Sequence, residues 1–252
     1  MMKNMPFVFV ESDPSGTDPL QEELALLDLA AQGRRAAQLW EAPVSLVVPR
    51  SYLRYPGFET ARASFAGRGC PVWLRMSGGG LVPQGPGILN LSLAYAVTRP
   101  PGALSEAVYL HLCEVVGGAL RSLGVATHWQ SVDGSFCDGR FNLAWGPAEQ
   151  ARKIAGTAQY WRRAPASMQT DDNQRHLVLA HAVLVVSADI DEINQRANAF
   201  ENEAGSGRHY DARKVVSVQE AMGDVAVGRE GSLMSMVSRA LKEGLDGIAL
   251  PQ

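Results

Sequence analysis

The sequence predicts an α+β fold with a mixed, largely antiparallel sheet flanked by helices. Strand-like segments follow one another without an intervening helix at residues 71–97 and again at 125–186, whereas a doubly wound parallel sheet needs a helix after each strand. Helix-like segments stand near both ends and in the middle of the chain. We expect one domain over residues 1–252, in which the residues beyond about 215 form a small helical cap.

The first half of the chain is predicted to mix helices and strands. Residues 18–33 indicate a helix, because Asp18 suits its N-cap, Pro19 its first position and Gly33 its exit. Its expected apolar face consists of Leu20, Leu24, Leu27 and Ala31. Next come a strand region broken by a proline, a short helix, and two strands joined by a glycine-rich loop, at 38–49, 57–69, 71–77 and 87–97.

The second half begins with a long amphipathic helix from Ser105 to Leu123, which Gly124 ends. Four strands are predicted after it, at 125–132, 140–146, 153–163 and 176–186. The polar stretch 169–175 is typical of a hairpin tip. Three helices close the chain, at 188–202, 216–223 and 231–245.

Composition excludes several classes of protein. The 252 residues are 46% apolar, and 23 basic against 26 acidic groups give a net charge of −3, which favours a globular chain and argues against nucleic-acid binding. No apolar run reaches the roughly 18 residues of a membrane span, and the N-terminus lacks the pattern of a secretory signal. We therefore expect a cytoplasmic protein without a nucleic-acid or membrane partner. The spacing of its cysteines and histidines predicts neither disulfides nor a metal site.

The first candidate for chemistry is the loop RMSGGGLVPQGPGILN at residues 75–90. Its glycines let the backbone approach a ligand, their successive N–H groups can converge on an anionic oxygen, and Arg75 adds a donor fork. The loop lacks the lysine of a Walker phosphate-binding loop. The alternative is a flexible hairpin without a ligand.

The second candidate is Cys137, in GSFCDGRFNL at residues 134–143. A cysteine between turn residues can present its thiol to a substrate, although a buried small apolar residue is the alternative. A strand, not a helix, follows it, which disfavours the nucleophile elbow of α/β-hydrolases.

The third candidate is Lys153, which enters a strand of small residues and loses hydration there. It is either a site residue or an edge-strand lysine that reaches solvent. For His181 a place in the core is expected.

Together, in this order, these segments resemble the biotin/lipoate A/B protein ligase family, whose members attach lipoyl or octanoyl groups to lysines of carrier domains. The resemblance covers roughly residues 20–200 and rests on RMSGGG with the following GILN, and on RKIAGTAQ at residues 152–159. It implies a single catalytic domain with a core like that of class II aminoacyl-tRNA synthetases and biotin ligases. The catalytic residues it implies are Cys137 and Lys153. The substrate-binding residues are Arg75, Ser77, Gly78, Gly79, Gly80, Gln84, Gly87, Asn90, Gly156, Thr157 and Ala158.

Three departures from the family's patterns bear on the reaction. Gln84 stands where the family usually has a histidine, GRFNL replaces the GRNDL of lipoate ligases, and the segment from Leu143 to Lys153 is longer than usual. Cys137, two residues before GRFNL, makes the chain most similar to the cysteine-dependent octanoyltransferase and amidotransferase branch. The resemblance therefore implies acyl transfer through a Cys137 thioester, with no cofactor.

Two other functions stay open. An ATP-dependent ligase would form a lipoyl-adenylate and need ATP and Mg. A non-catalytic homologue would only bind lipoyl carriers. All three hypotheses imply the same partners. These are the glycine cleavage H protein or the E2 lipoyl domains of dehydrogenases, together with an octanoyl or lipoyl group.

Overall fold

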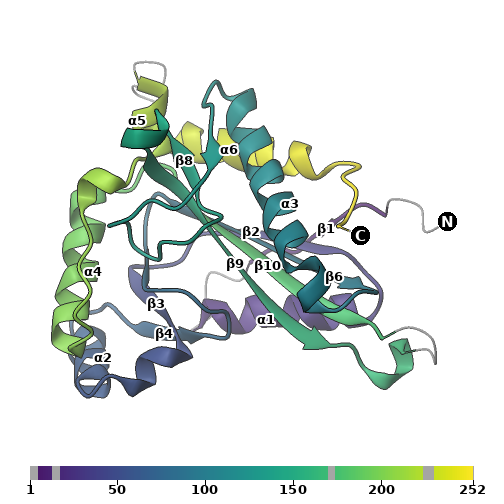
Figure 1. The fold of residues 1–252 in the computed structure, drawn as a ribbon, viewed down its shortest axis with the longest axis horizontal. Helices are drawn as coiled ribbons and strands as arrows, with labels where there is room; N and C mark the ends of the chain where they lie inside the picture. Colours follow the sequence, from purple (N-terminus) through teal and green to yellow (C-terminus); the bar gives the residue numbers. More distant parts are fainter. Residues whose placement is uncertain (1–4, 13–17, 170–173, 224–229, 252) are drawn as a thin grey trace.

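The chain folds around one large and one small sheet (Figure 1). The structure is a computed structural model that describes residues 5–12, 18–169, 174–223 and 230–251. In sheet order, the large sheet of this described part consists of β1 (Val8–Phe9), β2 (Ala36–Trp40), β6 (Ile88–Val97), β10 (His176–Val185), β9 (Arg152–Arg163), β8 (Leu143–Trp145) and β7 (His128–Trp129). Its described neighbours run antiparallel except β1 and β2. The predicted α+β class is confirmed.

Helices flank both sheets. They are α1 (Pro19–Ala31), α2 (Phe58–Gly67), α3 (Pro101–Ser122), α4 (Ile190–Ala204), α5 (Val218–Met222) and α6 (Glu230–Leu245). At the start of α1, the Asp18 side chain accepts a hydrogen bond from the N–H of Leu20 at 3.0 Å, with Pro19 in the first turn, as predicted. Glu23 is buried on α1 beside Leu20 and Leu27, so the inner face of this helix is less apolar than expected.

The small sheet is the main difference from the expected architecture. It consists of β4 (Val72–Arg75), β3 (Ser45–Pro49) and β5 (Val82–Gln84), in that order. The strand expected at 71–77 thus pairs with β3 and not with the strand at 87–97. Pro43 interrupts the strand region 38–49, and the two halves enter different sheets. Of the expected hairpin tip at 169–175, residues 170–173 lie outside the described residues.

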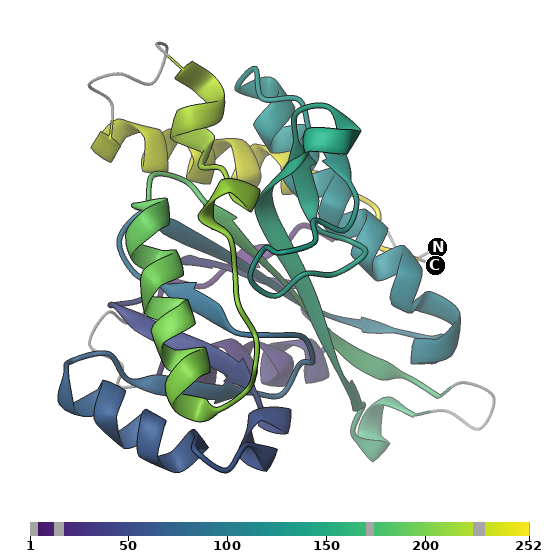
Figure 2. The ribbon, with the colours of Figure 1, turned by 60° about the vertical axis from the view of Figure 1, so that its left-hand side comes forward.

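Side-chain alternation along β10 divides the core between the two faces of the large sheet. Val178, Ala180 and Leu184 lie in the largest apolar cluster, which α3 and α6 complete. The alternate residues Leu179 and Val183 face the opposite side, where α1 and the small sheet lie. Beyond the small sheet, α2 and α4 lie side by side (Figure 2). The second face therefore meets two separate layers, and the site lies between them.

Helix α3 is long and apolar enough to cross a membrane by length and composition alone. Its apolar side is buried in the largest cluster together with Leu233, Val237 and Leu241 of α6. A core helix passes the same test, and the packing of α3 is that of a core helix.

Gly87, just before β6, is held by packing. It has a φ of +79°, and a Cβ built on it would lie 2.5 Å from the backbone nitrogen of Ala188. Gly33 has a φ of +80° with nothing within 4 Å of its Cβ position.

We expect Gly87→Ala to lower the free energy of unfolding by at least about 3 kcal/mol, because it adds both backbone strain and a steric clash. Gly33→Ala should lower it by about 1 kcal/mol, from strain alone. Urea denaturation of both variants measures the difference, and equal losses would contradict it.

Candidate active site

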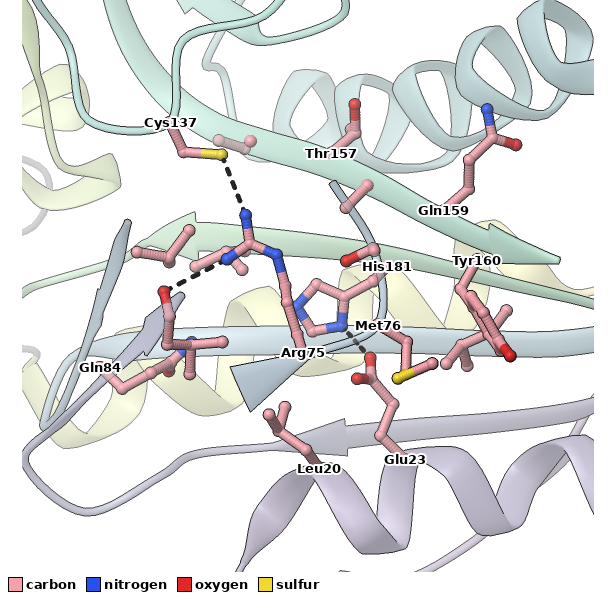
Figure 3. Close-up of a pocket in the computed structure, with 18 of the residues that line it drawn as sticks. Leu20, Glu23, Arg75, Met76, Gln84, Cys137, Thr157, Gln159, Tyr160 and His181 are labelled. Atoms are coloured by element: carbon pink, nitrogen blue, oxygen red, sulfur yellow. Dashed lines mark hydrogen bonds and ion pairs between the residues drawn. The ribbon is translucent and has the colours of Figure 1, made fainter. Parts of the chain in front are cut away.

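A mainly apolar cavity lies between α1, the strands β9 and β10, and the ends of β4 and β5 (Figure 3). Cys137 and Lys153 line it together with Arg75. The sulfur, the amine and the glycine-rich loop, which are far apart in the sequence, therefore meet at one place. Apolar residues that line the cavity include Leu20, Leu24, Val47, Leu74, Val82, Leu179, Val183 and Val185.

A tight loop presents Cys137 to this cavity. Asp138 shapes the loop, because its Oδ1 accepts hydrogen bonds from the N–H of Val132 at 2.7 Å and from Asn142 at 2.9 Å. Cys137 itself has a φ of +46°, in the left-handed region that favours glycine and is strained for a cysteine. The residue is half-buried, and its Sγ accepts the N–H of Gly80 at 3.2 Å and faces Nη2 of Arg75 at 3.5 Å.

Arg75 holds the glycine-rich loop in place. It is 8% exposed, and its guanidinium donates to the carbonyl oxygens of Gly78 at 2.9 Å, Gly80 at 2.6 Å and Val47 at 3.2 Å. A Cβ on Gly79 would lie 2.8 Å from the Cys137 sulfur, so only glycine leaves room there. The Arg75 donor fork, which was expected to meet an anionic oxygen of a ligand, is thus largely used on the loop itself, and its charge faces the thiol.

Lys153 fixes the Cys137 loop through hydrogen bonds to its backbone. The side chain is 2% exposed, and Nζ donates to the carbonyl oxygens of Phe136 at 2.7 Å and Cys137 at 2.9 Å. A Cβ on Gly156 would lie 3.0 Å from this Nζ, so the glycine makes space for the amine. Of the three N–H donors of an ammonium group, two are therefore used to fix the backbone of the nucleophile loop.

The charges around the sulfur favour its thiolate form. Burial alone would raise the pKa of the Cys137 thiol, but Arg75, Lys153 and the N–H of Gly80 outweigh it and hold this pKa below its ordinary value. Burial lowers the pKa of the Lys153 amine to about 8, although Cys137 and Asp138 act in the opposite direction.

The other predicted site residues fall into two groups. Ser77, Gln84, Gly156, Thr157 and Ala158 line the cavity. Asn90 is fully buried behind Gln84, and their amides exchange two hydrogen bonds at 3.0 and 2.9 Å. Gly87 packs against the backbone of residues 187–188 and reaches the site only by placing β6.

The sequence analysis missed a polar cluster that also lines the cavity. Glu23 pairs with Nδ1 of His181 (Figure 3). Its Oε1 also accepts a hydrogen bond from Ser92 at 2.9 Å. Trp40 in turn donates to Ser92 at 3.1 Å. The expectation that His181 lies in the core is corrected: it shares the cavity face of β10 with Leu179 and Val183. The missed signal was a glutamate on the apolar face of α1.

Comparison with known families identifies the fold. A family model described as the lipoyl protein ligase A/B catalytic domain matches residues 19–243. The chain belongs to this family. Among the described residues, no group of three His, Cys, Asp or Glu side chains is placed to hold a metal ion.

Relatives of this lipoyl ligase family member include an uncharacterised protein of Cupriavidus necator, 71% identical over 96% of this chain and 97% of that protein. An octanoyl-GcvH:protein N-octanoyltransferase of Kyrpidia tusciae is 34% identical over 75% of this chain, and the match covers 63% of that relative. This chain therefore spans less than two thirds of the length of the Kyrpidia enzyme.

Solved structures show the same fold at low sequence identity. Lipoate-protein ligase A bound with ATP has a TM-score of 0.64 and 17% identity, covering 95% of this chain and 84% of that one. The bipartite lipoate protein ligase of Thermoplasma acidophilum has a TM-score of 0.60 and 19% identity, covering 95% and 82%. The class II synthetase-like architecture expected from the sequence is thereby confirmed.

The lowered pKa of Cys137 predicts a pH-dependent difference among the three thiols. Burial raises the pKa of Cys113 to about 11 and also raises that of Cys70. We expect iodoacetamide to modify Cys137 at a pH where the other two do not react. Lys153→Met should move the midpoint of the Cys137 profile to higher pH, because one cation near the thiolate is lost. Intact-mass measurements with peptide mapping, across a pH series, follow the reaction.

Lys214→Met is the matched control, because Lys214 is an exposed lysine on the neighbouring segment. Its profile should equal that of the unmodified protein. A Lys153→Met profile that stays in place would contradict the assigned role of the buried amine.

Proposed function

We propose that this protein is a cysteine-dependent acyltransferase that moves an octanoyl or lipoyl group onto a lysine of a lipoyl carrier protein. Cys137 carries the acyl group as a thioester between two half-reactions. The apolar cavity holds the acyl chain, and its mainly aliphatic lining suits a hydrocarbon of this kind.

The observation that carries the proposal is the setting of the sulfur. A cysteine in a strained loop is held against a glycine N–H and two buried cations, Arg75 and Lys153. Such surroundings are those of a reactive thiol, whereas a structural cysteine lies among apolar groups. Cys113, buried within α3, shows that second environment in the same molecule.

In the first half-reaction, the Cys137 thiolate attacks the carbonyl carbon of the acyl donor. The S–C bond forms, and the bond to the donor breaks; the released thiol or amine keeps the electron pair and takes a proton. We expect two donors to stabilise the negative charge that develops on the carbonyl oxygen. They are the N–H of Gly80, which lies beside the sulfur, and the third N–H of Lys153, whose amine is fixed under the Cys137 loop. In the second half-reaction, a neutral lysine amine of the acceptor attacks the thioester, the C–S bond breaks and an amide forms. Cys137 leaves as thiolate, and the amine releases one proton to solvent, which balances the proton taken up by the first leaving group.

The relatives support carrier proteins as the partners. The name of the Kyrpidia tusciae enzyme specifies octanoyl-GcvH as its donor and a protein as its acceptor, and the Thermoplasma acidophilum ligase is described with its E2 lipoyl domain. Since a thioester or amide donor already carries an activated or exchangeable acyl group, the proposed reaction uses no nucleotide.

The decisive experiment is intact-mass analysis after incubation with an octanoylated carrier. We expect an added octanoyl mass on Cys137 that neutral hydroxylamine removes, and its transfer to an unmodified lipoyl domain. Cys137→Ser should abolish both, because the oxygen nucleophile is far less ionised than a thiol. Cys113→Ser, a cysteine change away from the cavity, is the control and should transfer normally. Transfer by Cys137→Ser at the unmodified rate would remove the thiol from the mechanism.

An ATP-dependent ligase is the second candidate, because a structural neighbour was solved with ATP bound. We expect no pyrophosphate on mixing the protein with free lipoate, ATP and Mg, under conditions where carrier-to-carrier transfer proceeds. Pyrophosphate release without any acyl group on Cys137 would favour the ligase. Binding of lipoyl carriers without turnover of either donor would leave only the non-catalytic alternative.

A further inference from the structure

Tyr52 lies at a junction between the glycine-rich loop and α4, in the short 3-10 helix η1 (Arg50–Arg54). The side chain is fully buried. Its hydroxyl oxygen accepts the N–H of Leu81 at 3.1 Å and Nη1 of Arg208 at 3.2 Å. A hydroxyl has two acceptor positions and one proton, so the two N–H donors fill the acceptor positions and the proton is left for a third partner.

That partner is Glu201 of α4, which is also fully buried. The Tyr52 hydroxyl donates to its Oε1 at 2.6 Å, and the Tyr210 hydroxyl donates to the same oxygen at 2.5 Å. Burial, and then the bond to Glu201, raise the pKa of the Tyr52 hydroxyl, which therefore keeps its proton. The carboxylate thus fixes the direction of the Tyr52 O–H and turns its lone pairs toward Leu81 and Arg208.

The loop residue that Tyr52 holds is next to the one that meets the sulfur. Leu81 directly follows Gly80, whose N–H donates to Cys137 Sγ. Arg75 fixes the carbonyl oxygens of the loop, while Tyr52 accepts the N–H of Leu81, which is itself fully buried. A buried N–H without an acceptor is costly. Loss of the Tyr52 oxygen would therefore pull the loop away from its present position.

We infer that Tyr52, oriented by Glu201, is a positioning residue that sets the Gly80 N–H against the Cys137 sulfur and against the carbonyl oxygen of the acyl group. The part that concerns the acyl group rests on the proposed function. Tyr52 does not itself line the cavity; it acts through Leu81.

The test compares Tyr52→Phe with Tyr210→Phe. Each variant removes one hydroxyl that donates to the same oxygen of Glu201, but only Tyr52 also reaches the glycine-rich loop. We expect Tyr52→Phe to raise the apparent pKa of Cys137 alkylation by about one unit and to lower the kcat of acyl transfer roughly tenfold, with little change in KM. Tyr210→Phe should leave both values unchanged while losing a similar amount of thermal stability.

Other charged groups near the thiol are kept constant or tested. Arg75, Lys153 and Tyr109 interact with it electrostatically, and Asp138 acts on the amine of Lys153. Nη1 of Arg208 lies 3.0 Å from the position that a Cβ on Gly80 would take. Arg208→Gln leaves the Leu81 bond to Tyr52 intact and should shift the alkylation profile less than Tyr52→Phe. An equal or larger shift would assign the effect to charge and overturn the inference.

If Tyr52→Phe does not fold, Glu201→Gln is the second variant, because it keeps the side-chain volume and weakens the orienting acceptor. It should raise the alkylation pKa in the same direction. An unchanged profile in the folded variant, or the same shift in Tyr210→Phe, would contradict a positioning role. Alkylation reports on the sulfur whatever the acyl donor. If the proposed function fails, which transfer by Cys137→Ser would show, the alkylation profiles of the Tyr52 and Tyr210 variants can still be compared.

Discussion

The site depends on the burial of two cations beside one thiol. Burying an unpaired charge is far more costly than burying a hydrogen-bonded one, and both cations are satisfied mainly by backbone carbonyls. Arg75 can reach its carbonyls only if the glycine-rich loop folds back over it, and Lys153 only if the nucleophile loop turns above it. The strained φ of Cys137 and the bare backbone of Gly79 and Gly156 follow from these two requirements.

The large sheet allows this polar site to exist inside an apolar core. Alternate residues of β10 send one set of side chains to α3 and α6 and leave the other set for the cavity. The cavity set includes His181, yet its polar partners Glu23 and Ser92 bond with one another and with Trp40. A polar cluster that is satisfied within the protein can border an acyl chain at little cost, because the chain takes no hydrogen bond away from it.

Local signals in the sequence predicted the elements well, and long-range pairing poorly. The N-cap Asp18 and Pro19 of α1 act within one helical turn, so the sequence alone was enough to predict their roles. The pairing of β4 with β3 was not, because both strand candidates were short apolar runs that suited either sheet. In the site, RMSGGG and Cys137 stood out by composition. Tyr52 and Glu201 did not, since a tyrosine in a turn and a glutamate in a polar helix acquire meaning only when α4 brings them together.

The position of Cys137 and the charges around it favour its thiolate form, which suits the acylation and release proposed for this sulfur. A strongly lowered pKa gives more thiolate but a weaker nucleophile, and it also makes the sulfur a better leaving group. In the proposed mechanism, the first half-reaction depends on the sulfur as a nucleophile, and the second depends on it as a leaving group. Burial opposes the effect of Arg75 and Lys153 on Cys137, and the pKa of the thiol still lies below its ordinary value.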